Sequence, residues 1–187
     1  MSNWGPIEEL VDRSDLWTRF IYREELDSTS RFLRNWDDLE TGVIVLAEKQ
    51  TSGRGKGTRK WYSPEGGLWF SFTLGDSISQ NIQEFYVEVL NLITNLLEDY
   101  GVSAQISRPN DLVVEGDKIA GMLIEQKAGN YIVGIGMNVN NDISDLPELV
   151  KDRSTTMKEV TGKEFDRARL LGDFLSKFED YYSTRNS

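Results

Sequence analysis

Apolar residues recur along the chain with two different spacings, and the change from one spacing to the other predicts the order of helices and strands. Between residues 82 and 100 they return every three or four positions, which predicts an amphipathic helix that ends at Gly101. A last helix is predicted to begin after Asp166, whose side chain would cap it. The buried face of that helix would carry Leu170, Leu171, Phe174, Leu175, Phe178 and Tyr181.

Three further segments carry weaker helical signals. Residues 27–30 offer capping side chains, and apolar residues follow at helical spacing over 32–36, so a short helix is predicted there. Another short helix is predicted over 155–160. Residues 1–16 are expected to form either a loosely packed segment or a short helix.

The other apolar residues lie in short runs rich in aromatic and β-branched side chains, which predict strands. These runs cover residues 16–26, 43–47, 68–74, 102–107, 112–115, 118–126 and 131–138. The run at 43–47 is continuously apolar and predicts a strand buried on both faces. Residues 115–117 and 127–130 are typical of hairpin turns. Strands interspersed with helices indicate an α+β fold, with a mixed β-sheet and flanking helices.

Length and composition limit the partners and the catalytic mechanisms that the chain can have. The 187 residues fit a single domain, 1–187, and their 21 basic and 31 acidic side chains give a net charge of −10, so no nucleic-acid partner is expected. The chain has no cysteine and no histidine, which excludes thiolate and histidine zinc sites, cysteine nucleophiles and Ser-His-Asp catalysis. Neither a signal peptide nor a membrane-spanning run is visible, so a cytoplasmic protein without a membrane partner is expected.

One segment departs from this acidic background. Residues 49–64 carry five cations and no acid, so the rest of the chain holds 16 cations against 31 acids, a charge of −15. Three glycines at 53, 55 and 57 would let backbone N–H groups approach an anion closely. The pattern therefore favours a loop that binds phosphate or carboxylate groups. The alternative is a mobile basic surface loop.

Four other motifs are weaker by themselves. Residues 108–111 read as an ordinary turn, and Lys118 could be a solvated strand lysine, although the small residues at 120 and 121 would let another group approach the strand closely. Glycines at 134 and 136 weaken a strand unless something must come close. Ser28 and Thr29 could cap a helix or bind a small polar ring.

Taken together and in order, these motifs make the chain resemble the biotin protein ligases. The segments that carry the resemblance are Leu26–Ser30, Gln50–Gly55 with Arg59–Trp61, Gly66–Leu68, Pro109–Asp111, Lys118–Gly121 with Glu125, and Gly134–Asn140. The resemblance extends from about residue 20 to residue 182, with similar spacings between the motifs.

The resemblance implies the biotin and lipoate ligase type of catalytic domain, which is class II synthetase-like, and a two-step reaction. The carboxylate of biotin would attack the α-phosphate of ATP, with Mg²⁺ shielding the departing pyrophosphate. A lysine of a biotin carboxyl carrier protein or domain, part of a biotin-dependent carboxylase, would then attack the biotinyl-5′-AMP. A homodimer is one further expectation, because relatives often pair sheet edges.

The resemblance also implies the role of each site residue. Lys118 and Arg54 would be the catalytic residues, because two anions must meet and cations lower their repulsion. The implied biotin-binding residues are Ser28, Thr29, Gln50, Gly53, Arg54, Gly55, Lys118 and Gly121. The implied ATP and adenylate contacts are Arg54, Lys56, Arg59, Trp61, Asn110, Asp111, Lys118 and Asn138. Asp111 is also the candidate metal ligand.

The chain departs from the family pattern at three positions. Ser107 and Arg108 stand where relatives usually have Lys-Trp, and Arg108 would supply the missing cation one residue along. Lys56 replaces a common arginine and is expected to hold the intermediate less tightly. No N-terminal helix-turn-helix domain and no C-terminal SH3-like domain are expected. Two alternatives stay open: a lipoate protein ligase, and a non-catalytic relative that binds biotin or adenylate.

Overall fold

The computed structural model describes residues 4–75, 81–107 and 109–185. Its helices are α1 (Gly5–Val11), α2 (Thr29–Arg34), α3 (Ile82–Asp99), α4 (Glu148–Lys151), α5 (Met157–Thr161) and α6 (Arg167–Arg185), with a 3₁₀ turn at Ile143–Asp145. Its strands are β1 (Arg19–Leu26), β2 (Val43–Gln50), β3 (Leu68–Leu74), β4 (Gln105–Ser107), β5 (Asp111–Val114), β6 (Asp117–Lys127) and β7 (Asn130–Met137).

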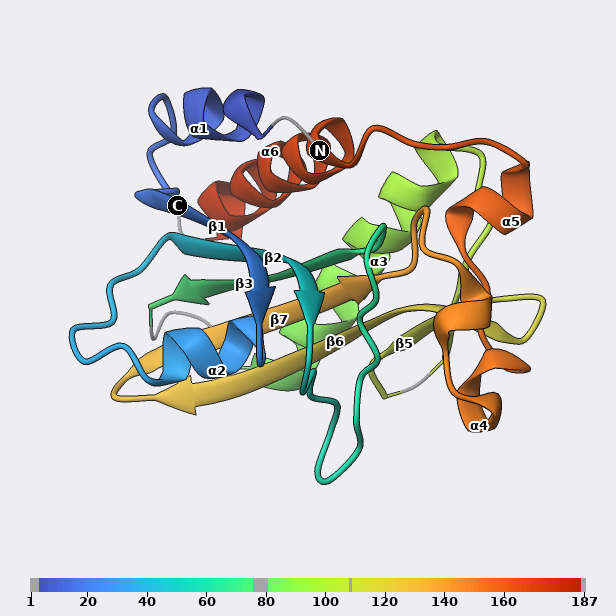
Figure 1. Cartoon of the computed structure of the whole chain (residues 1–187). Helices are drawn as coiled ribbons and strands as arrows, with labels where there is room; N and C mark the ends of the chain where they lie inside the picture. Colours follow the sequence, from blue (N-terminus) through green and yellow to red (C-terminus); the bar gives the residue numbers. More distant parts are fainter. Residues whose placement is uncertain (1–3, 76–80, 108, 186–187) are drawn as a thin grey trace.

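The strands form one sheet in the order β1-β2-β3-β7-β6-β5-β4 (Figure 1). Only β1 and β2 pair in parallel, and the other neighbours pair antiparallel, which confirms the predicted mixed sheet. The hairpin turns are confirmed as well, since the pairs Glu115–Gly116 and Ala128–Gly129 all have positive φ angles. No helix in the described part of the chain is long and apolar enough to cross a membrane.

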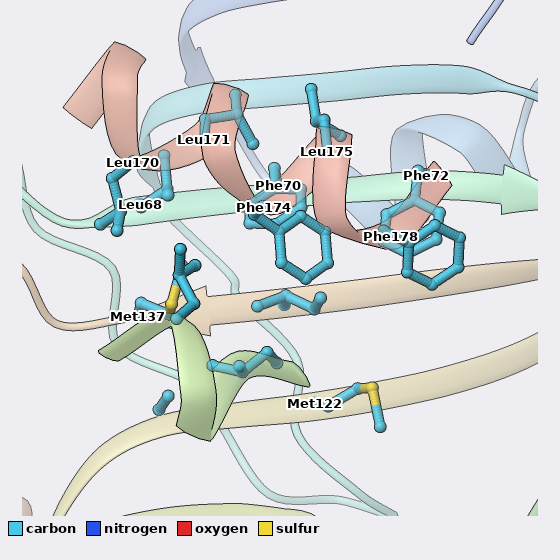
Figure 2. Close-up of a cluster of buried hydrophobic side chains, with 14 of the residues drawn as sticks. Leu68, Phe70, Phe72, Met122, Met137, Leu170, Leu171, Phe174, Leu175 and Phe178 are labelled. Carbon is cyan, nitrogen blue, oxygen red and sulfur yellow. The ribbon is translucent and has the colours of Figure 1, made fainter. Parts of the chain in front are cut away.

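Helices α1, α3 and α6 cover one face of the sheet, and α2 lies on the other (Figure 1). The predicted apolar face of α6 is confirmed: Phe174 and Phe178 pack on Phe70 and Phe72 of β3, with ring centroids 4.9–6.1 Å apart (Figure 2). This aromatic layer excludes water from one face of the central strands and provides the main core.

Of the two predictions for the N-terminal segment, the short helix is confirmed and the loosely packed segment is wrong. It forms helix α1, and it is not loosely packed, because Trp4, Ile7 and Val11 are buried in the main core. The strand predicted to start at residue 16 begins at Arg19 instead. Trp17 is fully buried and donates its indole N–H to the carbonyl of Leu175 on α6, at 3.2 Å.

Candidate active site

The second face of the central strands is hollowed by glycines. Gly136 of β7 pairs with Trp69 of β3 on one side and with Gly121 of β6 on the other. The Trp61 indole fills the space above them: a Cβ on Gly136 would lie 2.5 Å from Trp61 Nε1, and one on Gly121 would lie 3.1 Å from Trp61 Cζ3. The expectation that a group approaches these small residues closely is therefore confirmed.

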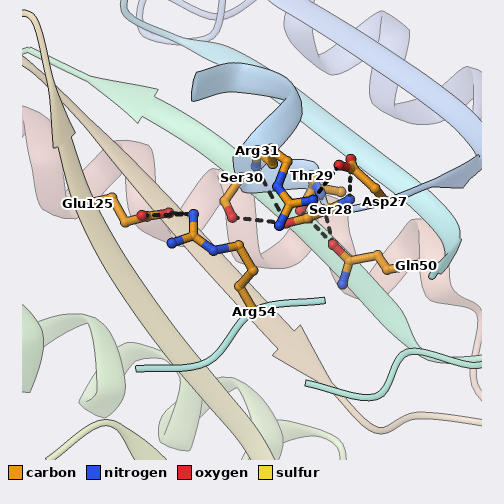
Figure 3. A network of polar contacts seen from close by, with 8 residues as sticks. All are labelled: Asp27, Ser28, Thr29, Ser30, Arg31, Gln50, Arg54 and Glu125. Atoms are coloured by element: carbon orange, nitrogen blue, oxygen red, sulfur yellow. Dashed lines mark hydrogen bonds and ion pairs between the residues drawn. The ribbon is translucent and has the colours of Figure 1, made fainter. Parts of the chain in front are cut away.

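A chain of neutral polar groups forms one end of this hollow (Figure 3). Gln50 Oε1 accepts hydrogen bonds from the backbone N–H of Thr29 at 2.8 Å and from its hydroxyl at 3.2 Å. The Thr29 hydroxyl lies 2.7 Å from the Ser71 hydroxyl, and Gln50 Nε2 donates to Ser63 at 2.7 Å. Because every partner is uncharged, this end suits a small ring that both donates and accepts hydrogen bonds.

Ser28 serves the fold as well as the pocket. Its hydroxyl caps α2 by accepting from the backbone N–H of Arg31, and it lies 3.0 Å from the hydroxyl of Ser30. The capping alternative is therefore correct for Ser28, and the same residue still lines the pocket. Ser28, Thr29 and Ser30 are all buried at the N-terminal end of α2.

The basic loop is a folded hairpin-like turn. Arg54 and Lys60 pair across it, and the backbone N–H of Trp61 donates to the carbonyl of Gly53 at 2.9 Å. Gly53 is required for close approach, because a Cβ there would lie 2.4 Å from the Trp61 carbonyl oxygen. This turn projects from the end of β2 and returns to β3 (Figure 1).

The five cations of residues 49–64 are not equivalent. Lys49 pairs with Glu25 at 2.9 Å, away from the glycine hollow. The Arg54 side chain lines the hollow, and its guanidinium binds Glu125 of β6 at 2.9 Å (Figure 3). Lys56, Arg59 and Lys60 are exposed and line the mouth of the pocket. Four of the five cations therefore surround a single hollow.

Lys118 reaches the same hollow from β6. Its ammonium lies 2.8 Å from Asp111 Oδ1 and 4.7 Å from the centroid of the Trp61 ring. Backbone hydrogen bonds with Arg153 and Thr155, of 2.9 and 3.0 Å, hold the strand at this position. The alternative of a solvated strand lysine is wrong, because the side chain is only 33% exposed and has an anionic and an aromatic partner.

Most of the predicted site residues meet in one pocket of about 670 Å³, including its open mouth. The predicted residues that line it are Ser28, Thr29, Gln50, Arg54, Gly55, Lys56, Arg59, Trp61, Asn110, Asp111, Lys118 and Gly121. Gly53 does not line this pocket and instead shapes the loop from behind. Arg108 lies outside the described residues.

A second pocket, of about 400 Å³ including its open mouth, shares lining residues with the first. Trp61 and Lys118 line both pockets, so their side chains form the boundary between them. Asn138 lines only the second pocket, where its Nδ2 donates to the carbonyl of Lys118 at 3.4 Å. Leu146 and Val150, from the segment before α5, give this pocket an apolar wall.

Two predicted nucleotide contacts also have structural partners. Asn110 is buried, and its Nδ2 donates to the carbonyl of Met122 at 2.8 Å, which fixes the turn before β5. Asp111 is the only carboxylate lining either pocket among the described residues, and its ion pair is with Lys118. No group of three potential metal-ligating side chains occurs in the described ranges.

Five polar residues of the site were not predicted as site residues, and one of them is Lys60 at the mouth of the pocket. Ser30, Ser63 and Ser71 belong to the neutral polar end, and Glu125 binds Arg54. Ser71 had a usable signal, since it is a lone hydroxyl in the apolar run 68–74, where a buried polar group needs a partner. Nothing local marks Ser63.

The fold and the pocket together define an α+β domain with a polar pocket beside a basic, glycine-rich turn. The model of the biotin/lipoate A/B protein ligase family matches residues 22–142, and the chain belongs to that family. The chain is 33% identical over 172 residues to the bifunctional ligase/repressor BirA of Bacillus subtilis, which covers 87% of the chain and 53% of that relative.

Two further relatives extend the comparison. Biotin protein ligase from Aquifex aeolicus, in complex with biotin and ATP, superposes with a TM-score of 0.81 and 36% sequence identity, over 88% of this chain and 70% of that one. Biotin–protein ligase 1 of Arabidopsis thaliana is 28% identical over 87% of this chain and 47% of its own length. The chain thus spans about half the length of the curated relatives it matches.

Proposed function

We propose that this chain joins biotin to AMP at the expense of ATP and transfers the biotinyl group to a lysine of a carrier protein. The observation that carries the proposal is the convergence of Arg54, from the loop after β2, and Lys118, from β6, on a pocket that also has a neutral, polar end. The neutral end of such a pocket suits an uncharged ring, and the cationic end suits an acid.

The neutral end is assigned to the ureido ring of biotin. The Ser28, Thr29 and Gln50 side chains, with Ser71 beneath them, present hydroxyl and amide groups already oriented by one another. Preorganised donors and acceptors reduce the entropy lost when a ligand binds. The valeryl carboxylate would then extend along the glycine hollow toward Arg54 and Lys118.

The first step needs no base, because the attacking carboxylate is already ionised at neutral pH. Its oxygen forms a bond to the α-phosphorus of ATP, the bond from that phosphorus to the β-bridging oxygen breaks, and pyrophosphate leaves with the electron pair. The barrier comes from the repulsion between two anions and from the charge that grows on the phosphate oxygens. Arg54 and Lys118 would offset both, and this explains a site that contains no histidine.

The second pocket is assigned to the adenine. Trp61 and Tyr62 offer aromatic faces, Leu146 and Val150 an apolar wall, and Asn138 an amide at its edge. Mg²⁺ fits this site as an ion carried by the phosphates of ATP, because Mg²⁺ needs only one or two carboxylates when phosphate and water supply its other ligands. Asp111 is the residue that would contact it.

In the second step the amine of the acceptor lysine attacks the carbonyl carbon of biotinyl-5′-AMP, and AMP leaves. The acceptor is proposed to be a biotin carboxyl carrier protein or domain of a biotin-dependent carboxylase, and the reaction is placed in the cytoplasm. The proposal includes a homodimer, supported by β1, whose outer edge is without a strand partner in the described part of the sheet.

Biotin-dependent exchange of labelled pyrophosphate into ATP tests the proposed function. The chain should catalyse exchange with biotin and Mg²⁺, and should not do so with lipoate or without an acid. Exchange with lipoate alone would instead identify a lipoate ligase. If biotin binds but supports no exchange, the chain is a non-catalytic relative and the proposal is wrong.

A further inference from the structure

The carboxylate of Glu125 forms ion pairs with two arginines. Arg54 Nη1, from the basic loop, lies 2.9 Å from both Glu125 oxygens. Arg34 Nη1, from the C-terminal turn of α2, lies 3.0 Å from Glu125 Oε1. The Glu125 side chain is only 12% exposed, so these are contacts between partly desolvated charges and not a loose surface pair.

We propose that Glu125 is a positioning residue that holds the guanidinium of Arg54 in the pocket before substrates bind. This inference rests on the proposed function, in which Arg54 binds the acid and the phosphate. Glu125 itself lies behind Arg54, does not line the pocket, and would touch neither substrate.

The geometry of the pair leaves Arg54 available. Only Nη1 contacts Glu125, whereas Nη2 and Nε have no hydrogen-bond partner among the described residues. A guanidinium has five N–H donors in a rigid plane, so fixing one corner orients the remaining donors. The other end of the side chain is fixed too, because the Arg54 backbone pairs with Lys60.

The position of Glu125 is itself fixed by the sheet. Glu125 pairs with Ile132 of β7, and the preceding residue, Ile124, donates its backbone N–H to the Tyr86 hydroxyl of α3 at 2.9 Å. Burial raises the pKa of Tyr86, so this hydroxyl stays neutral. Strand β7 on one side and Tyr86 on the other thus hold the Glu125 carboxylate as a rigid reference point for the exposed loop, which a partner on another loop would not provide.

The guanidinium of Arg34 offsets the negative charge of Glu125, which lies close to the proposed site for the acid and the phosphate. Two guanidinium groups and one carboxylate carry a net charge of +1, so an incoming anion still meets surplus positive charge. Arg34 lies on the outer side of Glu125 and does not line the pocket. It therefore balances the charge of Glu125 without competing for substrate.

The test compares the isosteric variant Glu125→Gln with wild type in biotin-dependent ATP–pyrophosphate exchange. The KM for biotin should rise by about 10- to 100-fold as one charge-assisted contact is lost, and kcat should fall in the same variant because Arg54 also faces the phosphate. Glu125→Asp, which keeps the charge on a shorter side chain, should recover part of the loss. The matched control is Glu88→Gln, which breaks a half-buried contact with Arg185 far from the pocket. It should leave the KM for biotin and kcat unchanged.

A double-mutant cycle with Arg54→Ala separates positioning from general stabilisation. If Glu125 acts through Arg54, the double variant Arg54→Ala/Glu125→Gln should be no worse than Arg54→Ala alone. Additive losses, or a wild-type KM for biotin in Glu125→Gln, would each overturn the inference and leave the proposed function intact. A wild-type chain without exchange activity would overturn both.

Discussion

The two faces of strands β3, β6 and β7 carry opposite kinds of side chain. On one face β3 presents Phe70 and Phe72 to helix α6, where rings fill the space (Figure 2). On the other face Ser71 lies beside Gly134, and Gly136 beside Gly121, and this leaves a hollow. Because side chains alternate along a strand, adjacent residues serve stability and binding separately.

This difference between the two faces predicts which substitutions reduce stability and which reduce activity. Changes on the aromatic face should reduce the free energy of unfolding and affect activity only through it. Changes on the hollow face should reduce activity while the domain stays folded.

Phe72→Ala should cost about 3 to 5 kcal/mol of unfolding free energy, because it opens a cavity among buried rings. The Phe72 ring centroid lies 4.9 Å from that of Phe178 and 5.3 Å from that of Trp17. Its neighbour on the opposite face provides the control. Ser71→Ala should cost only about 1 kcal/mol, the net value of a hydrogen bond. Urea unfolding measures both, and equal losses would contradict the division.

Lys118→Ala should lower kcat for biotin-dependent exchange by about 100- to 1,000-fold, the usual effect of removing a charge that stabilises a transition state. The midpoint of thermal unfolding should barely change, because among the described residues the Lys118 ammonium interacts with only Asp111 and the Trp61 ring. Lys177→Ala, which removes a surface contact with Asp99, is the matched control and should retain full activity. Undiminished exchange in Lys118→Ala would remove the lysine from the mechanism.

Gly136→Ala should raise the KM for ATP about tenfold, because Trp61 must leave a position shared by both pockets. A glycine-to-alanine substitution on the aromatic side should instead change stability and leave the KM unchanged. At Gly172, inside α6, a Cβ would meet Ile7 Cδ1 at 3.6 Å, an ordinary contact. Gly172→Ala should therefore stabilise the domain by about 0.5 to 1 kcal/mol, with KM unchanged. Steady-state kinetics and unfolding curves distinguish the two variants.

Tyr100→Phe should have the smallest effect, and its signature is a change in how stability falls at alkaline pH. Burial, with a hydrogen bond to Asp173 at 2.7 Å, raises the pKa of Tyr100 above its ordinary value of 10.0. Above pH 10 the unfolded chain loses this proton while the folded chain keeps it, so stability falls as pH rises. The fall should be shallower in Tyr100→Phe. Urea midpoints at about pH 8 and pH 10.5 measure it, and parallel curves would contradict the assignment.

Local patterns predicted much of the fold. The run 68–74 and the helix beginning at residue 82 have the expected bounds within one residue, because long periodic segments carry a strong signal. Helix α4 was missed, since four residues after Pro147 make too short a pattern. Helix α1 carried a usable signal, the spacing of Trp4, Ile7 and Val11, but its packing on α6 depends on tertiary contacts.

The site was predictable where residue type alone marks it, as for the glycines and cations of the basic loop. It was not predictable where sheet register decides. Ser71 and Glu125 reach the pocket region because β3, β7 and β6 pair with one particular alignment, and a shift of one residue would turn both side chains to the aromatic face. The pairing of Arg54 with Glu125 joins residues 71 positions apart, beyond any local pattern.

Single-turnover synthesis of biotinyl-5′-AMP tests the central claim most directly. The chain, in excess over α-labelled ATP and with biotin and Mg²⁺, should convert the nucleotide to biotinyl-5′-AMP, identified by its mass. Arg54→Ala should form it far more slowly while showing an unchanged unfolding midpoint. Formation at the wild-type rate in Arg54→Ala, or no adenylate from the wild-type chain, would contradict the account.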